Sequence, residues 1–116
     1  MFEGPTNQEN ISISEQEVIA ALEKMGIEDE ATKELLGKFV NQCQAEADKE
    51  AKEHPGDKVA NHRAHIKADI KVARVYFNTV RYEDHGREML EDLIPVTSED
   101  PELFDLAEEI DALLDF

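Results

Sequence analysis

Apolar side chains recur at steps of three or four residues through most of the chain, as expected for helices that bury one face. The longest uninterrupted run follows Pro55-Gly56, and no further Gly or Pro interrupts it before Gly86. Asp57 can accept the free backbone N–H groups at its start. The inward positions of this run are Val59, His62, Ile66, Ile70, Ala73, Phe77 and Val80. The pattern predicts a long central helix over residues 57–83.

Shorter helical patterns lie before and after the central one, and each is bounded by residues that start or stop helices. In chain order these signals are the Ser14–Glu17 capping box, Gly26, Asp29, His54, Gly86, Pro95 and Asp100-Pro101. No segment shows the alternation of a strand. We therefore expect an all-α fold, an antiparallel bundle of about five helices, with residues 14–116 forming one domain. Residues 1–13 are polar and contain Gly4-Pro5, which predicts a flexible arm.

Charge separates the central helix from the rest of the chain. The formal net charge is −16, and residues 81–116 contain thirteen acidic and two basic residues. The central helix instead carries a row of cations beside its apolar positions, here called the basic stripe: Arg63, Lys67, Lys71, Arg74 and Arg81. We expect acidic neighbours to flank and partly neutralise this stripe. The alternative is a stripe that stays open to an anionic ligand or to nucleic acid.

Composition limits the class of protein. The single cysteine, Cys43, excludes an internal disulfide and favours a reducing compartment. The N-terminus lacks the basic start and apolar run of a signal peptide, and no stretch has the ~18 apolar residues that span a bilayer. We expect a cytoplasmic protein without membrane contact. The strong negative charge argues against nucleic acid as a partner and favours a protein with a basic surface.

Residues 66–114 resemble a tetratricopeptide repeat followed by the first helix of another. Ala73, Tyr76, Tyr82 and Met89 fall where such a repeat places small, aromatic, aromatic and large apolar side chains, whereas His85, Asp92 and Thr97 depart from its pattern. The resemblance implies a protein-binding scaffold. The turn at Met25-Gly26-Ile27 also resembles part of a ubiquitin-associated domain, although no third helix of that kind follows it.

Few residues suggest chemistry. His62, His65 and Asp69 have a spacing that could bring ligands to one metal ion, but an ordinary surface pair of His65 and Asp69 is the simpler interpretation. Cys43 lies on the apolar side of its helix, where a thiol packs rather than reacts. No phosphate-binding loop, Cys-x-x-Cys pair or metalloprotease motif occurs. We expect no catalytic residue, no cofactor and no enzymatic activity.

The remaining features favour a non-enzymatic protein–protein interaction module, an acidic adaptor or regulator that could also self-associate as a dimer. The last helix presents apolar residues framed by acids, and Val72, Val75 and Tyr76 lie outside the main stripe of the central helix. The expected partner-binding residues are Leu103, Leu106, Ile110, Leu113, Asp105, Glu108, Glu109 and Tyr76. The alternative is an acidic inhibitor that mimics nucleic acid and occupies a basic groove on its partner.

Overall fold

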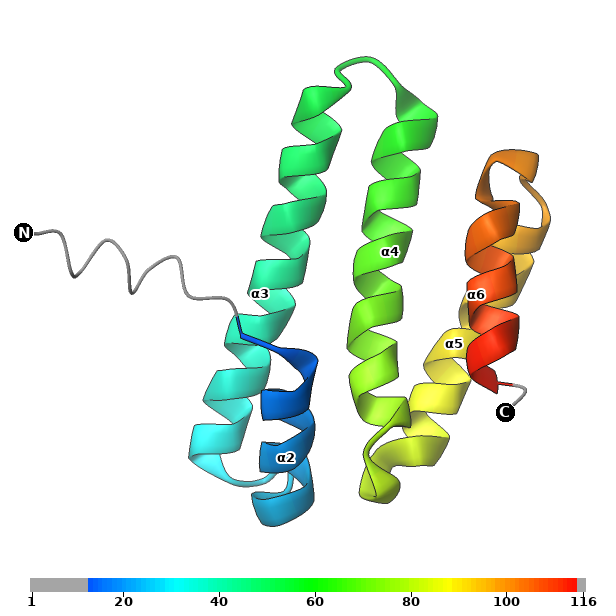
Figure 1. Ribbon diagram of the computed structural model, residues 1–116. Coiled ribbons are helices and arrows are strands. Elements are labelled where there is room, and N and C mark those ends of the chain that lie inside the picture. The colour runs from blue at the N-terminus through cyan, green and yellow to red at the C-terminus, as the bar shows by residue number, and fades with distance from the viewer. Residues whose placement is uncertain (1–12, 115–116) are drawn as a thin grey trace, which may run out of the picture.

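The computed structural model of the protein describes residues 13–114, which form five α-helices and two short 3-10 helices, without strands (Figure 1). In chain order they are α2 (Glu15–Met25), α3 (Glu30–Glu53), α4 (Lys58–Phe77), η1 (Val80–Tyr82), α5 (Glu83–Ser98), η2 (Pro101–Leu103) and α6 (Phe104–Leu114). The expected all-α bundle is confirmed. Of the predicted arm, residues 1–12 lie outside the described residues. Ile13 is held by Gln42, whose side-chain amide accepts from its N–H at 2.8 Å and donates to its C=O at 3.0 Å.

Three of the predicted helix starts form as expected. Ser14 and Glu17 make a capping box, in which each side chain accepts the backbone N–H of the other residue. Asp29 caps α3 and Asp57 caps α4, each by accepting the backbone N–H three residues later. Gly26 ends α2 at a φ of 83°, a conformation that favours glycine because other side chains would clash with the backbone.

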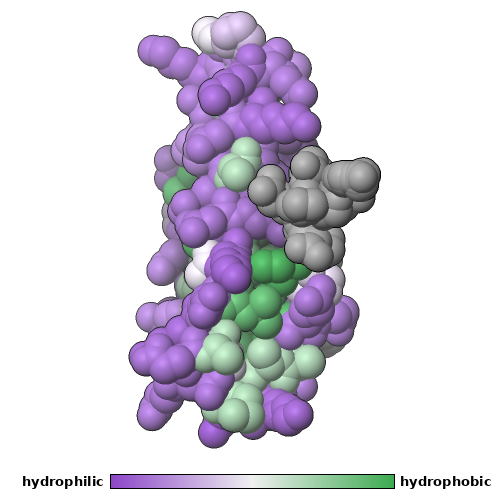
Figure 2. Space-filling model, turned by 90° about the vertical axis from the view of Figure 1, so that its left-hand side faces the viewer, coloured by the Kyte–Doolittle hydropathy of each residue, from purple (hydrophilic) through white to green (hydrophobic). Residues whose placement is uncertain are grey.

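The helices form a slab of 46 × 37 × 20 Å, which is about two helix diameters thick. α4 lies in the middle, antiparallel to α3 on one side and to α5 on the other (Figure 1). The face seen in Figure 2 is hydrophobic mainly at the level of α2 and hydrophilic beside the second half of α3. This agrees with the sequence of α3, which beyond Cys43 contains only alanine among its apolar residues.

The central helix α4 is buried on two sides rather than one. Ile66, Ile70, Ala73 and Phe77 pack with Leu90 of α5 and with α6. A second side, formed by Ala64, Ala68 and Val75, packs against α2 and α3. The prediction of a single inward stripe is confirmed for its middle part. It is wrong at its ends, because Val59, His62 and Val80 are exposed.

The predicted central helix over residues 57–83 is too long, since α4 ends at Phe77. The fully buried Thr79 donates its hydroxyl to the C=O of Val75 at 2.7 Å, and its backbone turns to an extended conformation. α5 then begins at Glu83, so that Gly86 lies inside α5 instead of before it. The next boundary also differs from the prediction, because α5 continues through Pro95 to Ser98.

Within residues 13–114, no helix combines the length and the apolar character needed to cross a membrane.

Candidate functional site

Four of the five residues of the basic stripe form ion pairs with acids on neighbouring helices. The pairs join Arg63 to Asp105, Lys67 to Glu50, Lys71 to Glu46, and Arg74 to both Glu15 and Glu109. The acids belong to α2, α3 and α6, so the stripe connects these three helices to α4. The expected neutralisation is confirmed for these four residues. Arg81 differs, since it lies in η1 with its guanidinium beside Gly26.

Arg74 makes the most connections within the basic stripe. It binds Glu15 in a bidentate manner, with its Nε and Nη2 atoms 2.7 and 2.6 Å from the two carboxylate oxygens. Its Nη1 atom donates to Glu109 at 3.2 Å. The hydrogen bond to Glu15 is the main reason why the pKa of Arg74 is raised. The side chains of Arg74 and Glu15 are each only 27% exposed, so this pair is less screened than the others. One guanidinium thus fixes α2 and α6 on the same side of α4.

Arg63 and Asp105 form the second bidentate pair. Arg63 Nη1 donates to Asp105 Oδ1 at 2.6 Å and to the C=O of Glu102 at 3.1 Å, while its Nη2 pairs with Asp105 Oδ2. The hydrogen bond from Arg63 lowers the pKa of Asp105 to about 2. A depressed pKa means that this pair stabilises the fold above the ordinary aspartate pKa of ~3.9. The contribution is lost as the pH falls through about 2.

Replacement of Arg63 by glutamine should therefore return the pKa of Asp105 toward its ordinary value of ~3.9. The measurement is an NMR titration of the side-chain carboxyl carbons. Lys67→Gln is the matched control, because Lys67 is also in the basic stripe but pairs with Glu50. It should leave the pKa of Asp105 near 2. An Asp105 carboxyl that titrates identically in the wild type and in Arg63→Gln would contradict this assignment.

The metal candidates are not brought together. His65 has both ring nitrogens engaged: Nδ1 lies 2.8 Å from the C=O of Asn61, and Nε2 lies 3.3 Å from a carboxylate oxygen of Asp48. These contacts, with the one to Asn61 first, raise the pKa of His65. His62 is exposed instead of bordering the core. In the part of the chain that the structure describes, no group of three or more His, Cys, Asp or Glu residues is placed to hold a metal ion.

Cys43 is 2% exposed, and burial raises the pKa of its thiol. A buried thiol with a raised pKa is largely protonated at neutral pH and is a poor nucleophile. Its role is to pack between α3 and α4, as expected from its position on the apolar side of its helix.

The apolar face of α6 is core rather than surface. Leu103, at the end of η2, and Leu106 and Ile110 of α6 are 1%, 3% and 0% exposed and pack against α4 and α5. They do not supply the exposed apolar surface expected from the sequence, because α6 uses that face to complete the core that it shares with α4 and α5. Leu113 is partly buried beside them. Of the acids expected to flank these apolar residues, Asp105 and Glu109 pair with the basic stripe, whereas Glu108 is exposed.

The extra apolar residues of α4 also have positions that the sequence did not predict. Val75 is fully buried against α2 and α3. Tyr76 is partly buried, with its ring edge-on to those of Tyr82 and His85 at centroid distances of 6.2 and 4.8 Å. Val72 is partly buried as well, and it lines a cavity on the other side of α4 from the basic stripe.

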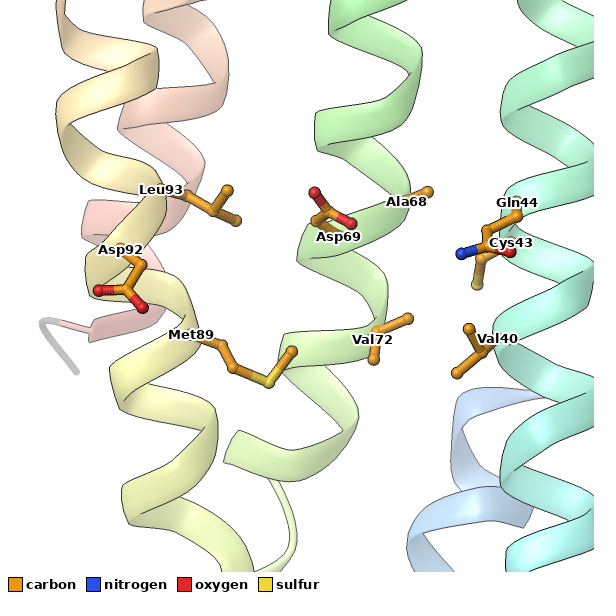
Figure 3. Close-up of a pocket in the computed structure, with 9 residues that line it drawn as sticks. All are labelled: Val40, Cys43, Gln44, Ala68, Asp69, Val72, Met89, Asp92 and Leu93. Carbon is orange, nitrogen blue, oxygen red and sulfur yellow. The ribbon is translucent and has the colours of Figure 1, made fainter.

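This cavity is an open groove of about 270 Å³ between α3 and α5 (Figure 3). Each of the helices α3, α4 and α5 contributes three residues to it. They are Val40, Cys43 and Gln44 of α3, Ala68, Asp69 and Val72 of α4, and Met89, Asp92 and Leu93 of α5. In Figure 3, Met89 and Leu93 reach from α5 toward α4, and Val40 and Val72 lie between α4 and α3. Six of the nine lining side chains are apolar.

The polar part of the groove is negative. Asp69 and Asp92 belong to the lining, whereas no lysine, arginine or histidine does. Burial raises the pKa of Asp69, which the nearby His65 partly counteracts. Neither carboxylate forms an ion pair with any residue between 13 and 114. The groove therefore combines apolar walls with negative charge that no lining cation offsets.

Most of this groove could not be predicted from the sequence. The available signal was Val72, an apolar residue outside the main stripe of α4, together with the flexible side chain of Met89, a residue type common on adaptable binding surfaces.

Comparison of the chain with protein-family models, curated proteins and solved structures finds no match.

Proposed function

We propose that this protein is a non-enzymatic interaction module that binds a partner protein in the groove between α3 and α5. The observation that supports the proposal is the groove itself. Four of its apolar side chains are only partly covered by the rest of the chain, and they come from three helices: Val40 of α3, Val72 of α4, and Met89 and Leu93 of α5. Partly covered apolar side chains around a concavity are typical of protein-binding sites.

The chemistry of the lining favours binding over catalysis. The lining contains no hydroxyl or amine nucleophile, and its one thiol, that of Cys43, is buried and has a raised pKa. A volume of about 270 Å³ is also at or below the lower end of pockets that enclose small ligands. It suits a few side chains projected from a larger partner.

The alternative, an acidic inhibitor that mimics nucleic acid, has less support. That function needs a dense array of free carboxylates. Asp105, Glu109 and Glu15 are instead paired with arginines of the basic stripe. Those pairs reduce the charge that the α2 and α6 side can offer to a basic groove on a partner.

The test compares the same substitution inside and outside the groove. Val72→Asp places a charge among the apolar lining residues, whereas Val80→Asp places it at a position that is 82% exposed and outside the lining. A protein captured by the wild type and by Val80→Asp should bind Val72→Asp at least about tenfold more weakly. Affinity purification with quantitative mass spectrometry identifies such proteins, and titration calorimetry with the purified partner measures the affinity.

Met89→Gln, a milder change in the same groove, keeps the test valid if Val72→Asp does not fold. Circular dichroism establishes that each variant is folded. Analytical ultracentrifugation of the same variants determines whether the partner is a second copy of the chain. Partners that bind folded Val72→Asp and Met89→Gln as tightly as the wild type would refute a binding site in this groove.

A further inference from the structure

We infer that the occupant of the groove is one amphipathic helix of a partner protein, with lysine or arginine side chains that pair with Asp69 and Asp92. This inference rests on the proposed function and specifies the class of partner. It follows from three observations: the backbone hydrogen bonds of the lining residues, the position of the groove in the slab, and the charge of the groove.

The backbone hydrogen bonds of the lining residues favour a helical occupant. All nine lining residues lie inside α-helices, where backbone N–H and C=O groups are already bonded to one another. An extended peptide would need free backbone groups to complete its own hydrogen bonds, as at the edge of a sheet. A helix has already formed its backbone hydrogen bonds within itself, so it needs only side-chain contacts with the groove. Its apolar side chains at steps of three and four would enter between Val72, Met89 and Leu93.

The position of the groove agrees with a helix. Arg74 pairs with acids of both α2 and α6 on the side of α4 that carries the basic stripe. The groove opens roughly 150° around the axis of α4 from the stripe, as the 100° rotation per residue places Ala68, Asp69 and Val72. There α3 and α5 form walls on either side of α4 (Figure 3). A docked helix would lie on α4 between these walls, as α2 and α6 lie on its other side.

Charge decides which helix fits. Asp69 and Asp92 contribute two negative charges to the lining, and the whole chain carries −16. A second copy of the chain would bring more negative charge to the site. Residues 1–12 of the chain contain two acids and no base, so their sequence does not complement the groove either. Lysine or arginine on the partner helix would pair with both carboxylates and guide the encounter of the two proteins.

The probe is a synthetic peptide of about 18 residues with leucines on one helical face and lysines on both flanks, long enough to form a helix. A scrambled peptide of identical composition, with leucines on all faces, controls for attraction to the net charge. Fluorescence anisotropy at ~0.15 M salt, where exposed charges are strongly screened, measures both affinities. The patterned peptide should bind about tenfold more tightly than the scrambled one. It should shift the backbone amide NMR signals of Val72 and Met89.

A pair of charge-matched double variants tests the carboxylates. Asp69→Asn with Asp92→Asn should weaken binding of the patterned peptide about tenfold. Glu91→Gln with Asp111→Asn removes the same charge from exposed positions outside the lining and should change binding less than ~twofold. Equal binding of both peptides, no binding of either, or equal effects of the two double variants would overturn the inference.

The two proposals can fail separately. A cellular partner lost in Val72→Asp but retained by the Asp69→Asn, Asp92→Asn variant would support a binding groove and refute the basic helix. A partner that binds Val72→Asp as tightly as the wild type refutes the binding groove, whatever the two peptides do. The failure of both proposals can therefore be told apart from the failure of the basic helix alone.

Discussion

Replacement of Gly86 by alanine should lower the free energy of unfolding by more than about 3 kcal/mol or prevent folding altogether. A Cβ atom at this position would lie 2.5 Å from Cα and 2.8 Å from Cβ of Phe77, and closer still to the Phe77 nitrogen. These are mostly backbone atoms at the end of α4, which no side-chain rotation can move. The first turn of α5 would have to separate from the end of α4, and the core that these two helices share with α6 would open.

Gly37→Ala is the matched control, since Gly37 is also inside a helix but has nothing within 4 Å of its Cβ position. It should increase stability by about 0.5–1 kcal/mol, because alanine favours the helix over glycine. Chemical denaturation followed by circular dichroism measures both variants. Similar gains at Gly37 and Gly86 would mean that α5 does not approach Phe77 as closely as the structure shows.

This contact also explains why the end of α4 could not be predicted from sequence. The helical pattern continues from Phe77 through Val80 without Gly or Pro, so periodicity alone favours a helix to residue 83. The chain turns earlier because Gly86 allows α5 to pack directly on Phe77. The benefit of that packing is tertiary, and a local pattern contains no information about it.

The burial of α4 on two sides could not be predicted from the sequence for a different reason. Ile66, Ile70 and Phe77 form a strong apolar stripe, whereas the side facing α3 is built from Ala64 and Ala68. Alanine contributes little to an apolar pattern, although it allows two helices to approach closely. Val75 therefore looked like surplus apolar surface, while it is fully buried beside those alanines.

The two candidate surfaces of α4 differ in how far the sequence could predict them. The basic stripe is a property of one helix in an acidic chain, so its neutralisation by neighbours followed from charge alone. The groove takes three residues from each of three helices. It exists because no segment of residues 13–114 covers that side of α4, and no pattern within a single helix indicates such an uncovered side.

The second large effect expected is at Ile110, where alanine should lower the free energy of unfolding by about 2–4 kcal/mol. Ile110 is fully buried with Ile70 and Leu90 in the core between α4, α5 and α6. The substitution removes apolar atoms and leaves a cavity that the surrounding helices cannot close. Chemical denaturation measures the loss, and it distinguishes α6 as part of the core from α6 as a partner-binding surface.

Phe104→Ala is the control on the same helix, because Phe104 is 49% exposed and removal of its ring should cost less than about 1 kcal/mol. If α6 were a docking surface that packs only loosely on the bundle, Ile110→Ala would cost as little as Phe104→Ala and would instead weaken partner binding. If α6 completes the core, Ile110→Ala lowers stability while the folded fraction still binds partners in the groove with unchanged affinity. Together, the measurements of stability and affinity distinguish a partner-binding surface on α6, as expected from the sequence, from a binding site in the groove between α3 and α5.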